Sequence, residues 1–283
     1  MATQTAVISN ARPQKTSTRF LPREHGATAM LFTPIVCAAA LARSWRWAEL
    51  ATLIAAFAAL AAKDPMVVLA RQRFVWKQWH PETSAAIRWF AGWTVLLCLS
   101  GLVLLVAWPF TVTVSLGLGV GVFSALAIAI NVKNRQRSTL FQIASAFALT
   151  SSSLAISLSA TGTIAPWCWS LWPLLALQAT AGILVVHARL DARIALRTTA
   201  PARENYRRAA QISLVVLVCT AVAAIVFHRG FIALALMLAA LGYAYDLHRQ
   251  RDAAALQLPL KSVGQQALAL SSLYAILLII GLW

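Results

Sequence analysis

Long apolar segments separated by short polar connections recur along the whole chain. Most of them approach the roughly 20 residues that a helix needs to cross about 30 Å of hydrocarbon. The pattern therefore predicts an all-α protein, a polytopic membrane helix bundle with nine transmembrane helices. The nine segments lie at about 26–42, 47–63, 87–108, 111–130, 139–160, 167–187, 210–228, 230–247 and 263–282.

Positive charge falls on alternate connections between these segments. The N-terminal arm and the connections after the second, fourth, sixth and eighth segments hold 21 of the 24 Lys and Arg residues, and the other side holds only Arg43, Arg46 and Arg229. Basic loops resist translocation across a bilayer, so this bias orients the helices. We therefore expect the N-terminus in the cytoplasm and the C-terminus outside.

Composition supports a membrane protein and changes the meaning of the charge. The chain is 60% hydrophobic and 11% charged, whereas soluble domains are roughly 25% charged. A net charge of +16 would favour nucleic acid as the partner of a soluble protein. Here the basic loops lie beside anionic headgroups. We expect membrane lipids as partners and no nucleic acid.

The chain divides into a polar arm and one apolar domain. Residues 1–20 are polar, and we expect them to form a flexible cytoplasmic arm. Residues 21–283 are expected to form a single transmembrane helical domain. The long polar stretch before the first apolar segment includes Glu24, and this arrangement fits a cleavable signal peptide poorly.

Ionisable residues gather at the cytoplasmic ends of the segments. Lys and Arg at helix ends often extend to lipid headgroups, which is the ordinary interpretation of each basic residue. Acids and histidines add nothing to topology, however, and ionisable groups near the membrane interior indicate function. Both interpretations stay open for the clusters, which are Arg23-Glu24-His25, Lys63-Asp64-Pro65 with Arg71, Lys133 to Arg137, and His187 to Arg193.

Spacing adds detail to the cluster that ends the sixth segment. His187 and Asp191 are four residues apart, so they share a helix face and can pair. Arg189 and Arg193 have the same spacing on a neighbouring face. Two guanidinium groups suit a phosphate or a carboxylate. The chain contains no Gly-rich phosphate loop, HExxH motif or nucleophile elbow that would identify a soluble-enzyme chemistry.

A hexapeptide at the start of the first segment carries a family resemblance. The run Pro22-Arg23-Glu24-His25-Gly26-Ala27 resembles the Pro-(Arg/Lys)-Glu-His-Gly-Ala signature of the YwiC-like family of bacterial membrane proteins. The motif is fairly specific, because it places two charges and a histidine at a membrane entrance. The family has no firmly established activity. The resemblance implies a multi-pass protein of the bacterial inner membrane.

The layout is also similar, more distantly, to that of the UbiA prenyltransferase superfamily. Those enzymes surround a cavity with nine helices, and Asp-rich motifs after the second and sixth helices bind a prenyl diphosphate through magnesium. The resemblance implies a UbiA-like arrangement, with Lys63 to Arg73 and His187 to Arg193 at the two motif positions and Lys133 to Gln142 as the basic loop. Asp64 and Asp191 are the only acids at the two motif positions, and magnesium usually takes several carboxylates. We therefore expect no metal and no cofactor.

The sequence favours an integral membrane protein that binds an amphipathic anion, of the isoprenoid or lipid phosphate type, in a basic cavity facing the cytoplasm. It resembles a UbiA-like transferase without the magnesium motifs, and whether it is an enzyme stays open. His25 and His187 are the candidate acid/base residues. The candidate ligand-binding residues are Arg23, Glu24, Lys63, Asp64, Arg71, Lys133, Arg137, Arg189, Asp191 and Arg193.

Two alternatives remain. A small-solute transporter or permease would use polar groups inside the membrane, and Ser151 to Ser153 and Gln178 are the modest candidates. The crowding of ionisable residues on one side, and the lack of a repeat between the two halves, weigh against that function. A membrane scaffold without a small ligand is the third interpretation.

Overall fold

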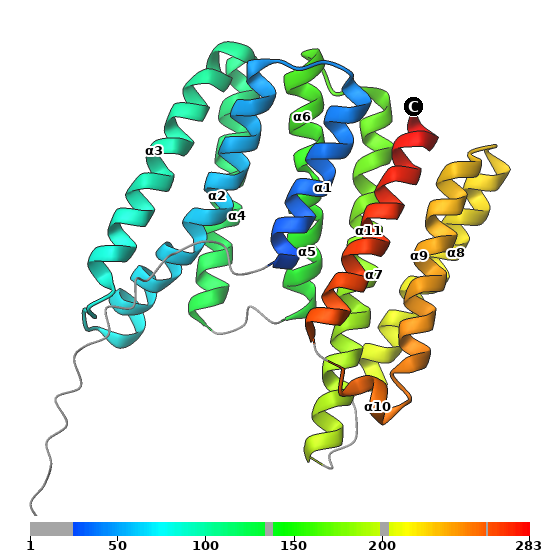
Figure 1. Cartoon of the computed structure of the whole chain (residues 1–283). Coiled ribbons are helices and arrows are strands. Elements are labelled where there is room, and N and C mark those ends of the chain that lie inside the picture. Colours follow the sequence, from blue (N-terminus) through cyan, green and yellow to red (C-terminus); the bar gives the residue numbers. More distant parts are fainter. Residues whose placement is uncertain (1–24, 134–137, 199–203, 259) are drawn as a thin grey trace, which may run out of the picture.

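The computed structural model describes residues 25–133, 138–198, 204–258 and 260–283, and within these residues every regular element is a helix (Figure 1). The predicted arm at 1–20, together with Arg23, Glu24 and Arg137, lies outside the described residues. The elements are α1 (His25–Ala42), α2 (Trp47–Arg71), the π-helical turn η1 (Gln72–Trp76), α3 (Thr83–Ala107), α4 (Phe110–Val132), α5 (Thr139–Thr150), α6 (Ser152–Thr161), α7 (Pro166–Thr198), α8 (Glu204–Val226), α9 (Gly230–Arg249), α10 (Ala253–Leu256) and α11 (Leu260–Leu282).

Within the described residues, eight helical segments are long and apolar enough to cross a membrane. They are α2 with η1, α3, α4, α5 with α6, α7, α8, α9 and α11. The predicted all-α, polytopic membrane bundle is confirmed. The first of the nine predicted spans corresponds to α1, whose 18 residues extend over about 27 Å at 1.5 Å per residue. Its role as a ninth span stays a prediction, as does the orientation of the bundle.

Two helices continue well beyond the apolar segments that predicted them. The second segment was expected to end at Lys63, but α2 passes through Pro65 to Arg71. The sixth was expected to end near 187, but α7 continues to Thr198. The apolar pattern shows which residues can contact hydrocarbon. A helix continues for as long as its backbone hydrogen bonds continue, so it can extend beyond the apolar segment. The charged clusters at these ends are therefore helical.

The fifth predicted span is interrupted in the middle. It forms two helices, α5 and α6, which meet at Ser151. The indole Nε1 of Trp172, on α7, donates a hydrogen bond to the backbone oxygen of Phe147 at 3.0 Å. Ser152 Oγ donates to the backbone oxygen of Leu31, on α1, at 3.2 Å. Contacts from two neighbouring helices thus stabilise an interruption that a continuous apolar run did not predict.

The main core lies among α1, α7, α8, α9 and α11, and alanines are frequent in it. Small side chains let helices approach closely in lipid, where packing replaces the hydrophobic effect as the driving force. Gln178 Nε2 on α7 donates to Tyr243 Oη on α9 at 2.7 Å and to Ser271 Oγ on α11 at 2.9 Å. Gln178, a candidate polar group of the transporter interpretation, therefore joins three helices.

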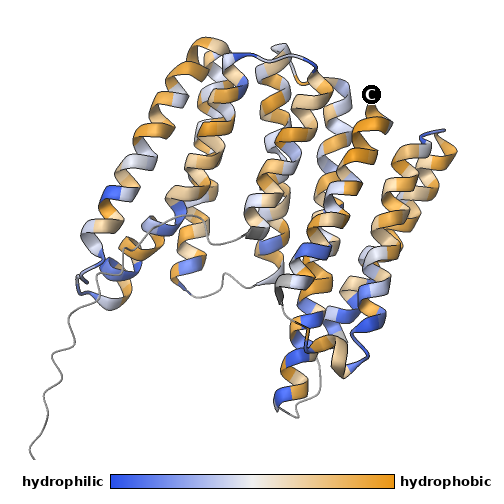
Figure 2. Cartoon of the chain, in the orientation of Figure 1, coloured by the Kyte–Doolittle hydropathy of each residue, from blue (hydrophilic) through white to orange (hydrophobic). Residues whose placement is uncertain are grey.

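The outer surface of the bundle is apolar, and its ends are polar. Figure 2 shows hydrophobic residues along the length of the helices and hydrophilic residues gathered towards the lower end of the bundle, including the lower end of α7. At the other end, the guanidinium carbon of Arg43 lies 3.9 Å from the ring centroid of Trp283. The connection after α1 and the C-terminus therefore lie at the same end of the bundle. Of the four cysteines, Cys37 and Cys168 are buried, and Cys98 and Cys219 are exposed on this apolar surface.

The orientation can be tested by cysteine labelling in a variant without the native cysteines. Gln78, after η1, and Thr163, after α6, are both exposed. We expect Gln78→Cys to react with a membrane-impermeant maleimide only after the cells are opened, because basic loops stay inside. Thr163→Cys should react in intact cells. Labelling of position 78 in intact cells would show that the topology is the reverse of the predicted one.

Candidate anion-binding site

The start of α1 has a central place among the helices. α1 packs against α2, α5, α6, α7 and α11, and its lower end stops short of the lower ends of α4 and α7 (Figure 1). The first N–H groups of a helix have no partner within the helix, and they favour an anion. His25 is the first residue of α1, and its side chain lies outside what the structure describes. A helix start is thus directed towards the polar end of the bundle.

A guanidinium group occupies the end of α4. Arg71 Nη2, near the end of α2, donates a hydrogen bond to the backbone oxygen of Asn131 at 2.8 Å. Cations near the last carbonyl groups of a helix are stabilised by those groups and by the helix dipole. Lys133 follows directly and is exposed. The structure therefore places two of the candidate cations at one helix end.

Lys63 and Asp64 lie about one turn beyond the middle of α2, directly before Pro65. Both side chains are half-buried, and both take part in polar or electrostatic interactions. A half-buried lysine beside a carboxylate is a group that can be held in position for an anionic ligand. These residues share a helix with Arg71, two turns further on.

The second polar group joins α5, α7 and α8. His187 Nε2 lies 2.8 Å from Gln142 Oε1, and the imidazole ring stacks on Tyr206 with 5.3 Å between ring centroids. An amide oxygen only accepts hydrogen bonds, so in this arrangement Nε2 donates and Nδ1 of the neutral ring is an acceptor. The contact gives His187 one defined tautomer, which suits a base. His187 was expected to pair with Asp191; Gln142 is the partner that the structure gives.

Arg189 faces a different part of the bundle. Its guanidinium is 4% exposed, and Nη1 donates to Asp246 Oδ1 at 2.7 Å while Nη2 donates to the backbone oxygen of Ala255 at 2.6 Å. Gln250 Nε2 lies 3.3 Å from the other oxygen of Asp246. These contacts join α7 to α9 and α10. Arg189 thus has a structural role, and the anion-binding role expected for it stays a prediction.

The candidate residues therefore fall into groups around α1. One group contains the α2 and α4 residues, and the other contains His187 with Gln142 on α5 and α7. Asp191 and Arg193 are half-buried on α7, one to two turns beyond His187. Whether all of these side chains line one cavity stays a prediction.

Several partners were not selected as site residues from the sequence. Gln142 and Gln250 each place a side-chain amide against a candidate residue or its partner, and Asn131 accepts from Arg71 through its backbone oxygen. A lone amide at the edge of an apolar segment marks Gln142 most clearly, whereas Gln250 lies among charged residues and carries no such signal. Tyr206 carries no such signal, because aromatic residues are common at membrane interfaces.

The comparisons with known proteins identify one family. The family described as "YwiC-like protein" matches residues 21–157, which is just under half of the chain and includes the hexapeptide at 22–27. The predicted resemblance to this family is confirmed. The matched region contains α1 to α5 and most of α6. No curated protein and no solved structure matches the chain.

Proposed function

We propose that this multi-pass integral membrane protein, in which residues 21–157 match the YwiC-like family, binds an amphipathic anion of the isoprenoid phosphate or lipid phosphate type. The ligand's head would lie at the start of α1, at the cytoplasmic end of the bundle. The proposal includes a location in the bacterial inner membrane. A more distant relationship to UbiA-like transferases belongs to the same proposal.

The proposal rests on which helices pack against α1 and which ionisable residues those helices carry. α1 packs against α2, α5 and α7, and α2 and α7 supply Lys63, Arg71 and His187. In this proposal the cations and the first N–H groups of α1 come together on the anionic head, since charge-assisted hydrogen bonds are the strongest of their kind. Because the helices are apolar just above this level, a ligand with a hydrocarbon tail fits better than a free phosphate.

Catalysis is the second step of the proposal. A neutral imidazole with Nδ1 as its acceptor can take a proton from a ligand hydroxyl or from water, and Gln142 fixes the His187 tautomer that does so. His25 would act on the same head from the start of α1. The reaction would transfer the hydrocarbon group to an acceptor hydroxyl: the bond from its carbon to the phosphate oxygen breaks, the phosphate leaves, and the hydroxyl bonds to that carbon and gives its proton to His187.

Binding can be tested with the full chain in lipid nanodiscs. We expect farnesyl monophosphate to bind at least tenfold more tightly than farnesol, which lacks the charge. It should also bind at least tenfold more tightly than inorganic phosphate, which lacks the tail. Equal binding of farnesol would show that the basic residues do not recognise a head group, and the proposal would be wrong.

Magnesium should contribute little to this binding. Asp64 and Asp191 are the only acids at the two positions where the UbiA-like enzymes have several, and hard divalent cations require more oxygen ligands than these supply. In the same titration, a chelator should leave the dissociation constant of farnesyl monophosphate within a few-fold of its value with magnesium. If binding required magnesium, the phosphate head would be recognised through a metal ion and not by the Lys and Arg side chains, and this part of the proposal would be wrong.

A transporter remains the second candidate, because the interruption at Ser151 divides a membrane helix into α5 and α6. Broken helices are frequent at transporter binding sites. Flux of labelled phosphate or short-chain carboxylates into proteoliposomes tests this candidate. We expect no flux above protein-free vesicles, since the ionisable candidates lie at one end of the bundle.

A further inference from the structure

The imidazole ring of His187 is held on two sides by residues of other helices. Its Nε2 lies 2.8 Å from Gln142 Oε1, on α5. Its face stacks on the ring of Tyr206, on α8, with 5.3 Å between the ring centroids and 19° between the planes. Among the residues that the structure describes, no further polar partner of His187 is present. Nδ1 is therefore the ring nitrogen that remains for a ligand.

Both contacts stay favourable when the imidazole gains a proton. In the neutral ring Nε2 donates to Gln142, because an amide oxygen only accepts hydrogen bonds. Protonation adds a hydrogen to Nδ1 and leaves the Nε2 contact as it is. The face of an aromatic ring carries negative partial charge and attracts a cation within about 6 Å of its centroid. Tyr206 therefore stabilises the imidazolium more than it stabilises the neutral imidazole.

Charged side chains near the imidazole come from its own helix and from α8. Asp191 lies one turn further along α7, is half-buried and takes part in an interaction of its own. Arg207 and Arg208 directly follow Tyr206 and are exposed, and Arg208 also takes part in an interaction. Glu204 begins α8, and its side chain lies outside what the structure describes. Because both signs of charge are present, the charges of α7 and α8 partly cancel at the ring.

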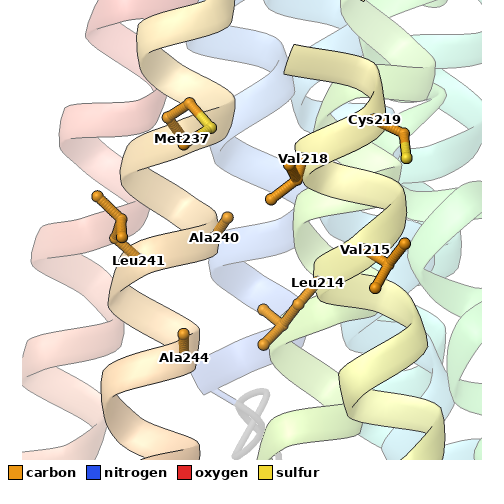
Figure 3. Close-up of a pocket in the computed structure, with 8 residues that line it drawn as sticks. All are labelled: Leu214, Val215, Val218, Cys219, Met237, Ala240, Leu241 and Ala244. Carbon is orange, nitrogen blue, oxygen red and sulfur yellow. The ribbon is translucent and has the colours of Figure 1, made fainter. Parts of the chain in front are cut away.

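The other helices that pack against α7 bring little charge to the ring. α5, α6 and α10 contain no ionisable residue. α1 begins with His25 and α11 carries Lys261 in its first turn, and the structure describes neither side chain. On α9, Asp246 forms an ion pair with Arg189 at 2.7 Å. Higher up, α8 and α9 face each other across a crevice with an apolar lining (Figure 3). Protonation of the imidazole therefore makes this place distinctly more positive.

We propose that His187, held by Gln142 and stacked on Tyr206, is a proton-dependent binding residue for the anionic head. This inference rests on the proposed function and names a regulation of that site. The imidazole takes up a proton from water at Nδ1, and the resulting N–H donates a charge-assisted hydrogen bond to the head. Tyr206 is a positioning residue, because its ring stabilises the imidazolium and does not itself contact the ligand.

Titration of the full chain in lipid nanodiscs with decanesulfonate tests this inference. A sulfonate keeps one negative charge between pH 5.5 and pH 7.5, whereas a phosphate monoester titrates near pH 6. An unperturbed imidazole is charged below about pH 6.5 and neutral above it, so we expect binding roughly tenfold tighter at pH 5.5 than at pH 7.5. Decanol, which has the same chain without the charge, should bind equally at both values.

Matched variants separate the proton from the stacking. His187→Gln should bind decanesulfonate at both pH values as the unchanged protein does at pH 7.5. Tyr206→Leu should lose most of the tightening at pH 5.5 but keep the affinity at pH 7.5, which a general loss of packing would also lower. Tyr206→Phe keeps an aromatic face and should retain both affinities. His248→Gln, at an exposed position on α9, is the control for histidines elsewhere and should bind as the unchanged protein does.

Three results would overturn the inference. Equal affinities of the unchanged protein for decanesulfonate at both pH values would show that no proton contributes. A pH dependence that His187→Gln retains and His25→Gln loses would place the proton on the other histidine. A pH dependence that Tyr206→Leu retains in full would leave the stacking with a packing role only. In each case, binding of farnesyl monophosphate at pH 7.5 would leave the proposed function standing, and its absence would remove both.

Discussion

Replacement of Arg189 by alanine is expected to lower the free energy of unfolding by about 3 kcal/mol, the low end of the range for breaking a buried ion pair. The guanidinium is almost fully buried, and it donates to Asp246 and to the backbone oxygen of Ala255. Its removal leaves a carboxylate without its partner cation and a carbonyl group without a donor. Asp246 is 26% exposed, so water compensates in part.

Reversible unfolding in mixed micelles measures this effect. Arg197→Ala, on the exposed last turn of α7, is the matched control and should change stability by less than about 0.5 kcal/mol. Arg189→Lys should recover only part of the loss, because an ammonium group cannot reach two separate acceptors as a guanidinium does. If Arg189→Ala is as stable as the unchanged protein, the contacts with α9 and α10 do not hold the bundle together.

Replacement of Lys63 by alanine is expected to weaken the binding of farnesyl monophosphate at least tenfold. A hydrogen bond to a charged group contributes roughly 1.5–3 kcal/mol, and every 1.4 kcal/mol corresponds to a factor of about ten in affinity. Lys63 is half-buried in α2, the helix that packs against α1 and also carries Arg71. Farnesol has no charged head for Lys63 to bind, so its weaker binding should be the same in Lys63→Ala and in the unchanged protein.

Lys77→Ala provides the matched control for Lys63→Ala. Lys77 follows η1, is exposed, and belongs to the same basic end of the bundle. Removing it lowers the net charge by the same amount but leaves the start of α1 unaltered. If both variants weaken binding equally, the ligand responds to the general positive charge of the loops and not to a site.

The number and position of most helices could be predicted from the length of the apolar runs, because the bilayer requires about 20 apolar residues for each crossing. The continuation of α2 through Pro65 could not. A proline removes one backbone hydrogen bond, and neighbouring helices decide whether the helix continues beyond it. The interruption at Ser151 could not be predicted either, because the contacts that stabilise it come from Trp172 and Leu31 on neighbouring helices.

The site was predictable in its chemistry and less so in its contacts. The excess of acids and histidines at one membrane face marked Lys63, Asp64 and His187. Spacing along α7 placed His187 and Arg189 on different faces but could not say which helix each face meets. The structure turns His187 towards Gln142 on α5 and Arg189 towards Asp246 on α9. Those partners lie far away in the sequence, so only packing reveals them.

Native mass spectrometry of the protein released directly from its own membrane is the most direct test of a bound amphipathic anion. We predict a non-covalent adduct whose fragments contain a phosphate group and a hydrocarbon chain. This adduct should be present on the unchanged protein and on Lys77→Ala, and it should be largely lost from Lys63→Ala. An unchanged protein that carries no such adduct, or a Lys63→Ala variant that retains it in full, would contradict the account.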